Sequence, residues 1–138
     1  MGDEERWDLT PGLTGRVAVE VDEGRTARWL GSGDLDVLGT PSVVALAEAA
    51  ACAAVAGRLP EGNTSVGTRV ELDHVAPTVP GRVVTAAATL TSVDGRTLEF
   101  GVTVEDEAGV VARGRHWRTI VDRERFLVSA RRRGGSPA

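Results

Sequence analysis

The sequence predicts an α+β domain in which one long central helix is wrapped by a curved antiparallel sheet of about five strands. Two observations lead to this prediction. Residues 40–56 (TPSVVALAEAAACAAVA) are almost wholly apolar, with one charged residue, Glu48, and a helix that is apolar on every side is expected to be covered on every side. After this run, four segments alternate apolar and polar residues with the period of a strand.

The 138 residues suit one domain, which we place at residues 1–130, with a disordered Arg/Gly-rich tail at residues 131–138 (RRRGGSPA). The net charge of −4 argues against a nucleic-acid partner, because phosphate binding needs a basic surface. No apolar run approaches the length of a bilayer span, so no membrane contact is expected. The single cysteine, Cys52, cannot form an internal disulfide. Together with the polar, acidic beginning of the chain, this favours a cytoplasmic location.

The residues ahead of the helix contain one clear strand signal. Residues 1–13 lack periodicity and are expected to form a loose lead-in, whereas residues 17–21 (VAVEV) alternate as a half-buried strand does. Residues 26–30 (TARWL) are predicted to be extended. The glycine- and aspartate-rich residues 31–39 (GSGDLDVLG) form the connection that leads into the helix, and we expect this connection to be the most mobile segment.

The ends of the helix carry their own signals. Thr40 is expected to cap the free N–H groups, and proline is favoured at the first helical position, where Pro41 lies. Alanine keeps helix propensity high, and its small side chain lets a sheet approach closely. The helix is predicted to end near Gly57, ahead of residues 59–62 (LPEG).

The remaining chain is predicted to form four antiparallel strands. In the first, Val66, Val70 and His74 are expected to share one face with Thr68 and Leu72. Asp94-Gly95 is a favoured two-residue hairpin turn. Because a sheet packed on one Ala-rich helix still leaves apolar surface and free edges, we expect a homodimer that continues the sheet. The strands are predicted at residues 64–74, 82–93, 97–104 and 110–121.

Glu48 is the first candidate for chemistry. Most helical glutamates lie on a solvated stripe, but the neighbouring residues of this helix offer almost no other polar side chain. A carboxylate held in apolar surroundings is costly unless it is paired, protonated or used. A structural and a functional interpretation of Glu48 both remain open.

Thr40 lies eight residues before Glu48, on roughly the same side of the helix. Capping alone explains a threonine there, yet a helix N-terminus also stabilises a developing oxyanion, and a hydroxyl at that place suits acyl chemistry.

His74 is either a strand-end histidine or a general base, and His116 is equally ambiguous. Two histidines and one cysteine without ligand spacing make a metal site improbable.

Taken in order, these residues resemble the hotdog-fold thioesterases, and among them the fluoroacetyl-CoA thioesterase-like branch. Thr40 and Glu48 match within the helix, and the matches continue with unbroken spacing to the last strand. The resemblance extends over about residues 17–126. The further matching motifs are S-V-G-T (residues 65–68), D-H (73–74), P-x-V-P-G (77–81), S-V-D-G-R (92–96) and G-x-H-x-R (114–118).

The resemblance implies a hotdog fold and an acyl-CoA or acyl-carrier thioesterase, with Thr40, Glu48 and His74 as the catalytic set. It also implies that Gly67 and Arg118 help to hold the substrate. The site would lie at the interface of a homodimer, and no cofactor or metal beyond the coenzyme A of the substrate is implied. In fluoroacetyl-specific members, phenylalanines ahead of the catalytic threonine act as a lid. Residues 31–39 contain no aromatic residue, so a different or broader short acyl group is expected.

Three mechanistic roles follow as hypotheses. Glu48 either attacks the thioester carbonyl or activates water, and His74 passes a proton to the leaving thiol. Thr40 either orients Glu48 or joins the attack, and the Gly67 N–H is a candidate donor to the oxyanion. An acyl-thioester hydratase or dehydratase, and a non-catalytic acyl-CoA-binding hotdog protein, are the alternatives.

Overall fold

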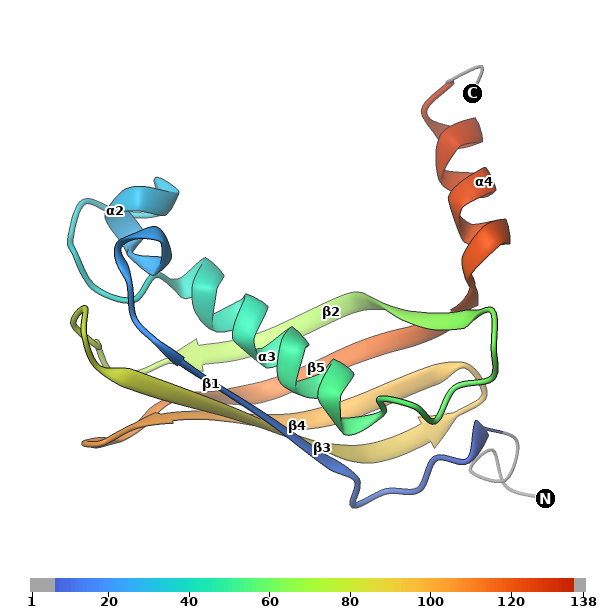
Figure 1. Cartoon of the computed structure of the whole chain (residues 1–138), viewed down its shortest axis with the longest axis horizontal. Helices are drawn as coiled ribbons and strands as arrows, with labels where there is room; N and C mark the ends of the chain where they lie inside the picture. Colours follow the sequence, from blue (N-terminus) through green and yellow to red (C-terminus); the bar gives the residue numbers. More distant parts are fainter. Residues whose placement is uncertain (1–6, 136–138) are drawn as a thin grey trace.

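A computed structural model of the chain describes residues 7–135. Five antiparallel strands form one sheet in the order β1-β3-β4-β5-β2, and helix α3 lies against one face of it (Figure 1). This confirms the predicted α+β class. The strands are β1 (Thr14–Glu20), β2 (Asn63–His74), β3 (Val83–Asp94), β4 (Thr97–Asp106) and β5 (Gly109–Asp122), and the helices are η1 (Glu23–Arg25), α2 (Ala27–Leu30), α3 (Thr40–Ala54) and α4 (Arg123–Arg133).

The alternating sequence pattern places the core between the sheet and α3. From Val84 to Leu90 in β3 and from Leu98 to Val104 in β4, every second residue is buried, as period-2 alternation requires. The β3–β4 hairpin turns at Gly95, whose φ of 61° suits a glycine. The strands contribute apolar residues to the core, including Val84, Leu90, Leu98, Phe100, Val104 and Ile120.

Helix α3 is covered on one side only, so the prediction that it is wrapped on every side is wrong for the protomer. Val43, Ala47 and Ala50 are fully buried against the sheet. Ala45 and Ala49, on the opposite side, are exposed. The reason is geometric, because one open five-stranded sheet curves around a single side of a helix.

Two predictions ahead of α3 are also wrong. Residues 26–30 are not extended, because Ala27–Leu30 form the short helix α2. The Thr26 side chain accepts a hydrogen bond from the Trp29 N–H, and Gly31 ends the helix in a left-handed conformation with a φ of 73°. The described part of the lead-in is fixed, since Trp7 and Leu9 are buried. Residues 1–6 of that lead-in lie outside the described residues.

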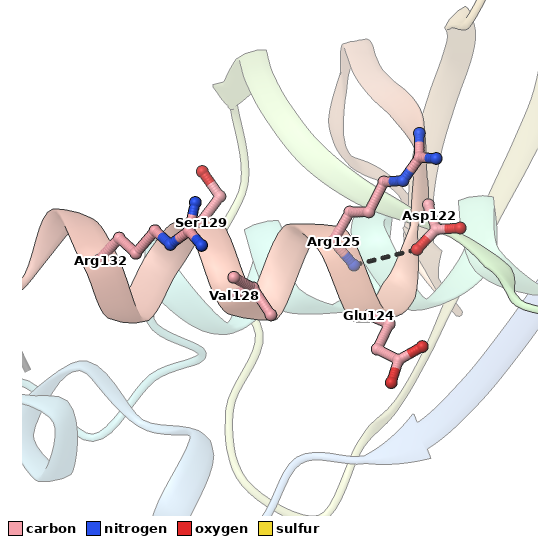
Figure 2. A pocket seen from close by; sticks show the side chains of 6 residues that line it. All are labelled: Asp122, Glu124, Arg125, Val128, Ser129 and Arg132. Carbon is pink, nitrogen blue, oxygen red and sulfur yellow. Dashed lines mark hydrogen bonds between the residues drawn. The ribbon is translucent and has the colours of Figure 1, made fainter. Parts of the chain in front are cut away.

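The C-terminal segment is more ordered than the sequence predicts. Arg131, Arg132 and Arg133 complete helix α4 instead of opening a disordered tail. The Asp122 side chain caps the helix by accepting from the Arg125 N–H at 2.9 Å, and arginine is favourable both in a helix and near its C-terminus. A hollow of about 500 Å³ runs along α4 itself (Figure 2). Residues 136–138 lie outside the described residues.

A β-bulge divides β2. Gly67 pairs with Arg118 and Arg69 pairs with Trp117, which leaves Thr68 unpaired. The extra residue reverses the alternation, so the prediction that Val66 and His74 share one face is wrong. Before the bulge, the β2 positions that face α3 are Ser65 and Gly67. After it, they are Val70, Leu72 and His74. Their partners on β5 are Ile120, Arg118, His116, Gly114 and Ala112.

Within residues 7–135, no helix is long and apolar enough to cross a bilayer. In the same part of the chain, no three His, Cys, Asp or Glu side chains are grouped to hold a metal ion.

Substitution of Gly15 tests the close approach of β1 to α3. A Cβ atom at Gly15 would collide with the helix backbone at Ala50 and Ala54, so we expect Gly15→Ala to destabilise the protein by about 2 kcal/mol or more. Gly101→Ala is the matched control, because its Cβ would meet only Thr91 Cγ2 at 3.8 Å. Urea unfolding of both variants measures the difference, and equal midpoints would contradict this account of the helix packing.

Candidate active site

Thr40 and His74 meet where α3 begins and β2 ends. The Thr40 hydroxyl lies 2.9 Å from His74 Nδ1, within hydrogen-bonding distance. His74 Nε2 is buried and, among the described residues, has no hydrogen-bond partner. A buried polar atom normally has one. This nitrogen is therefore the ring position available to a ligand.

Thr40 does not cap the helix as the sequence predicts. Gly39 is the N-cap residue and makes no side-chain capping bond, while Thr40 is the first helical residue, directly before Pro41. The Thr40 side chain is therefore not engaged with the helix N-terminus. Because Thr40 is exposed and hydrogen-bonded to an imidazole, its hydroxyl is available for proton transfer.

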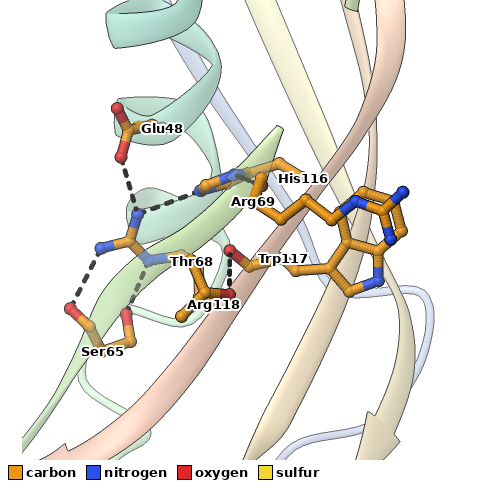
Figure 3. Close-up of polar contacts among 7 residues, drawn as sticks. All are labelled: Glu48, Ser65, Thr68, Arg69, His116, Trp117 and Arg118. Atoms are coloured by element: carbon orange, nitrogen blue, oxygen red, sulfur yellow. Dashed lines mark hydrogen bonds and ion pairs between the residues drawn. The ribbon is translucent and has the colours of Figure 1, made fainter. Parts of the chain in front are cut away.

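Glu48 lies at a second place, in the middle of α3. Its Oε2 atom is 3.5 Å from Arg118 Nη1 (Figure 3), and Gly67 of β2 lies close to the same carboxylate. A Cβ atom at Gly67 would approach Glu48 Oε2 to 2.6 Å. Only glycine therefore leaves room for the carboxylate at this point of the sheet.

Arg118 is buried and fixed from several sides, as Figure 3 shows. Its Nε donates to Ser65 Oγ at 2.8 Å, and its Nη2 donates to the Ser65 carbonyl at 3.0 Å. Its side chain is 7% exposed and that of Glu48 is 42% exposed. A buried guanidinium needs acceptors for its donors, and Ser65, His116 and Glu48 provide them. The solvent-accessible carboxylate of Glu48 thus lies next to the Arg118 guanidinium, which is itself fixed by Ser65.

His116 is neutral and structural. Its Nδ1 lies 2.8 Å from the Arg69 carbonyl, which can only accept, so Nδ1 carries the proton. Its Nε2 lies 3.1 Å from Arg118 Nη1, which can only donate, so Nε2 is unprotonated. Burial lowers the pKa of His116, and the charge of Arg118 lowers it further. The hydrogen bond to the Arg69 carbonyl and the charge of Glu48 raise the pKa of His116, but they offset only part of this lowering.

The predicted catalytic residues therefore form two groups. Thr40 pairs with His74, whereas Glu48 joins the two predicted substrate-binding positions, Gly67 and Arg118. Within residues 7–135, no hydrogen bond or ion pair is found between Glu48 and the Thr40–His74 pair. Eight residues of α-helix correspond to about 12 Å along the axis, which is the axial separation of the two groups on α3.

Ser65 is a residue of this candidate site that sequence reasoning did not single out, and it accepts two hydrogen bonds from Arg118. It belongs to the S-V-G-T motif, but the motif alone gives no reason for the serine. Its role depends on the pairing of β2 with β5, where Ser65 lies opposite Ile120 and Gly67 lies opposite Arg118. The alternation of β5 was the sequence signal that could have found it. This alternation places Arg118 and Ile120 on one face, and therefore also the β2 residues opposite them, Gly67 and Ser65.

Known proteins resemble this chain in both sequence and fold. The sequence profile of the fluoroacetyl-CoA-specific thioesterase family matches residues 21–124. The fluoroacetyl-CoA thioesterase of Streptantibioticus cattleyicolor is 36% identical over 98 residues, which is 71% of this chain and 70% of that protein.

Solved structures agree with this match. A fluoroacetyl-CoA thioesterase variant in complex with acetyl-CoA is 30% identical, with a TM-score of 0.86 over 91% of this chain and 98% of the other. A hot-dog-like protein from Thermanaerovibrio acidaminovorans is 26% identical, with a TM-score of 0.85 over 96% of this chain and 97% of the other. The fold is therefore the hotdog fold, and the chain belongs to the fluoroacetyl-CoA-specific thioesterase family.

Proposed function

We propose that this protein hydrolyses short acyl-CoA thioesters, with Thr40, Glu48 and His74 as its catalytic residues. Membership of the family makes the chain a thioester hydrolase. The observation that most strongly supports the residue assignment is the Thr40–His74 hydrogen bond, which pairs a hydroxyl with an imidazole at 2.9 Å. A nucleophile within hydrogen-bonding distance of a base is the arrangement that acyl transfer requires.

In the proposed reaction, the Thr40 hydroxyl attacks the thioester carbonyl while its proton passes to His74 Nδ1. The tetrahedral intermediate collapses and expels the coenzyme A thiolate, which takes up a proton from the imidazolium. This course uses the contact that the structure contains, because Thr40 is bonded to His74 and not to Glu48. Water then cleaves the acyl-threonine ester.

Glu48 supplies the base for that water. Its carboxylate is solvent-accessible and lies 3.5 Å from Arg118 Nη1, so it is placed to activate a water molecule. Direct attack of Glu48 on the carbonyl, which would give an anhydride, uses the same position. The backbone N–H of Gly67 is the proposed oxyanion donor, and Arg118 acts on the substrate through Glu48 because its own donors are occupied by Ser65.

We propose acetyl-CoA or a similarly small acyl-CoA as the substrate, with coenzyme A as part of the substrate and no separate cofactor. A family relative has been solved with acetyl-CoA. Residues 31–39 lie next to Thr40 and contain no aromatic side chain, which argues against a phenylalanine lid for a fluorinated group in this segment. An acyl-carrier protein in place of coenzyme A, and a cytoplasmic location, stay predictions.

We propose a homodimer formed through β2, with the active sites at the interface. Strand β2 is a free edge of the sheet, and residues 67–70 in its middle are exposed. A free edge invites pairing with another strand. With Thr68 as the extra residue of each strand, a twofold axis at Glu71 would set Gly67 of one protomer opposite His74 of the other. Glu48 above Gly67 would then reach the partner's Thr40–His74 pair, which its own protomer keeps about 12 Å away along α3.

Release of free thiol from a panel of acyl-CoAs tests the reaction itself. A hydrolase releases coenzyme A and acid in equal amounts. A hydratase or dehydratase would change the acyl chain without releasing thiol, and an acyl-CoA-binding protein would leave the thioester intact. Either of those results would contradict the proposed function.

Substitution of the catalytic residues tests their assignment. We expect Glu48→Gln and His74→Ala each to lower kcat by about 10³-fold or more, because each removes a group needed for proton transfer. Thr40→Val, which keeps the shape and removes the hydroxyl, should have a similar effect. Steady-state thioesterase kinetics measure the loss.

The exposed carboxylate Glu105, on β4, provides a matched control, and Glu105→Gln should keep full activity. Circular dichroism and size-exclusion chromatography should show that all four variants remain folded. If Glu48→Gln or His74→Ala retained full activity, that residue would not be catalytic.

Mixing two inactive variants tests whether the site spans the interface. When Glu48→Gln and His74→Ala protomers are co-refolded in equal amounts, about half of the dimers are mixed. Each mixed dimer holds one site with both residues intact, so about one quarter of the original activity should return. If each protomer contained a complete site, every site would lack one residue, and no activity would return.

A further inference from the structure

Apart from Val70 in the middle of β2, the exposed large apolar side chains of the described residues lie in two parts of the molecule. Trp29 and Leu35 are 65% and 64% exposed, and Phe126 on α4 is 43% exposed. Single exposed apolar residues are ordinary, but clusters of them mark surfaces that another group covers. One cluster contains Trp29, Leu30, Leu35, Val75, Val79 and Val83, and the other contains Phe126, Leu127 and Val128.

The first cluster, which we call the α2 surface, is held together by main-chain hydrogen bonds. The Arg28 N–H donates to the Leu35 carbonyl at 3.1 Å, which folds the α2 segment back on itself. The Leu38 N–H donates to the Thr78 carbonyl at 2.8 Å, which fastens this segment to the loop after β2. The α2 surface thus lies beside the end of β2 that carries His74.

The second cluster lies on α4, which has no buried residue in the protomer. The Arg123 N–H donates to the Gly62 carbonyl at 2.9 Å, and Asp122 pairs with Asn63. The helix therefore begins at the end of β2 opposite His74. Figure 1 shows α4 rising past the free edge strand β2, with α2 at the other end of the sheet.

Antiparallel pairing of two β2 strands brings opposite ends together. With the twofold axis at Glu71, Asn63 at the start of one β2 strand lies just beyond the partner's His74, at the end of the other. The α4 helix that starts beside Asn63 then projects toward the partner's α2 surface. We infer that α4 of each protomer packs its side chains Phe126, Leu127 and Val128 on the partner's α2 surface and covers the approach to the partner's Thr40–His74 pair, an inference that rests on the β2 dimer proposed above.

Charge supports this choice of partner. The last turn of α4 carries Arg131, Arg132 and Arg133. The α2 surface carries the exposed carboxylates of Asp34 and Asp36 beside its apolar residues. Asp36 lies 3.3 Å from Arg28 Nε, so Asp34 is the carboxylate that faces no ion-pair partner among the described residues. Apolar contacts flanked by opposite charges are complementary in both respects, so a second copy of this chain presents a fitting surface for α4.

The contact gives α4 a part in substrate choice. Residues 31–39, next to Thr40, offer no aromatic side chain to cover a bound acyl group. Phe126 of the partner subunit would supply an apolar cover over the same approach. The size of the acyl group that the site accepts is then set by two protomers.

Cross-linking between two singly substituted protomers tests the contact. After Cys52→Ser removes the native thiol, one preparation carries Trp29→Cys and the other carries Phe126→Cys with an added mass tag. The two are co-refolded and oxidised. We expect a disulfide-linked heterodimer on a non-reducing gel, in an amount at least about tenfold above that formed with Ser65→Cys in place of Phe126→Cys.

Light scattering and thioesterase assays on the same samples separate the possible failures. A monomer would overturn both the dimer and this contact. An active dimer without the cross-link would overturn the α4 contact and leave the proposed reaction and β2 dimer intact. A cross-link in an inactive protein would support the contact and contradict the proposed function.

Acyl-chain dependence provides a readout that dimer stability alone would not move. Phe126→Ser and Leu127→Ser together should change the ratio of kcat/KM for butyryl-CoA to that for acetyl-CoA by about fivefold or more, measured where light scattering shows a dimer. Ser129→Ala on the same helix is the control and should leave the ratio unchanged. An unchanged ratio in the double variant would overturn the role in substrate choice.

Discussion

One unpaired residue in β2 determines which side chains of the edge strand reach α3. Because Thr68 adds a residue to the ladder, Gly67 and His74, which are seven positions apart, lie on the same face. An unbroken strand would point one of them to the opposite side. The Thr68 hydroxyl donates to the Trp117 carbonyl at 3.3 Å, which helps to fix the bulge. The Thr40–His74 pair and the Glu48–Arg118 group both depend on this local irregularity, since each needs one half of β2.

Small residues make the second group possible. Alanines along the buried face of α3 and glycines in the strands bring the helix backbone close to the sheet, so a side chain as short as that of Glu48 reaches Arg118. The buried guanidinium would be costly if it were unsatisfied. Its bonds to Ser65 and to neutral His116 offset this cost, and the accessible Glu48 carboxylate can meet solvent and substrate. Burial of the cation and exposure of the anion thus give a carboxylate that is both oriented and usable.

Much of this arrangement could be predicted from sequence because it follows from periodicity. The long helix, the alternating strands and the turn at Gly95 all produce repeating or local signals. The bulge at Thr68 was not predicted, because Gly67 beside it can mark a bulge without requiring one, and the shift itself appears only when β2 meets β5. Helix α2 is four residues long, too short for a helical period to show. Thr40 was predicted as a cap because capping is a local property, whereas its actual partner, His74, lies 34 residues away.

The positions of the catalytic candidates are related to the surfaces that the protomer leaves without a packing partner. Strand β2 has a free edge, the outer side of α3 exposes Ala45 and Ala49, and α4 buries nothing of its own. Because Glu48 of α3 lies over Gly67 in one half of β2 and His74 lies in the other half, pairing that strand with its own copy would bring them together. Assembly and catalysis would then depend on the same residues, and separation of the protomers would dismantle the site without unfolding either one.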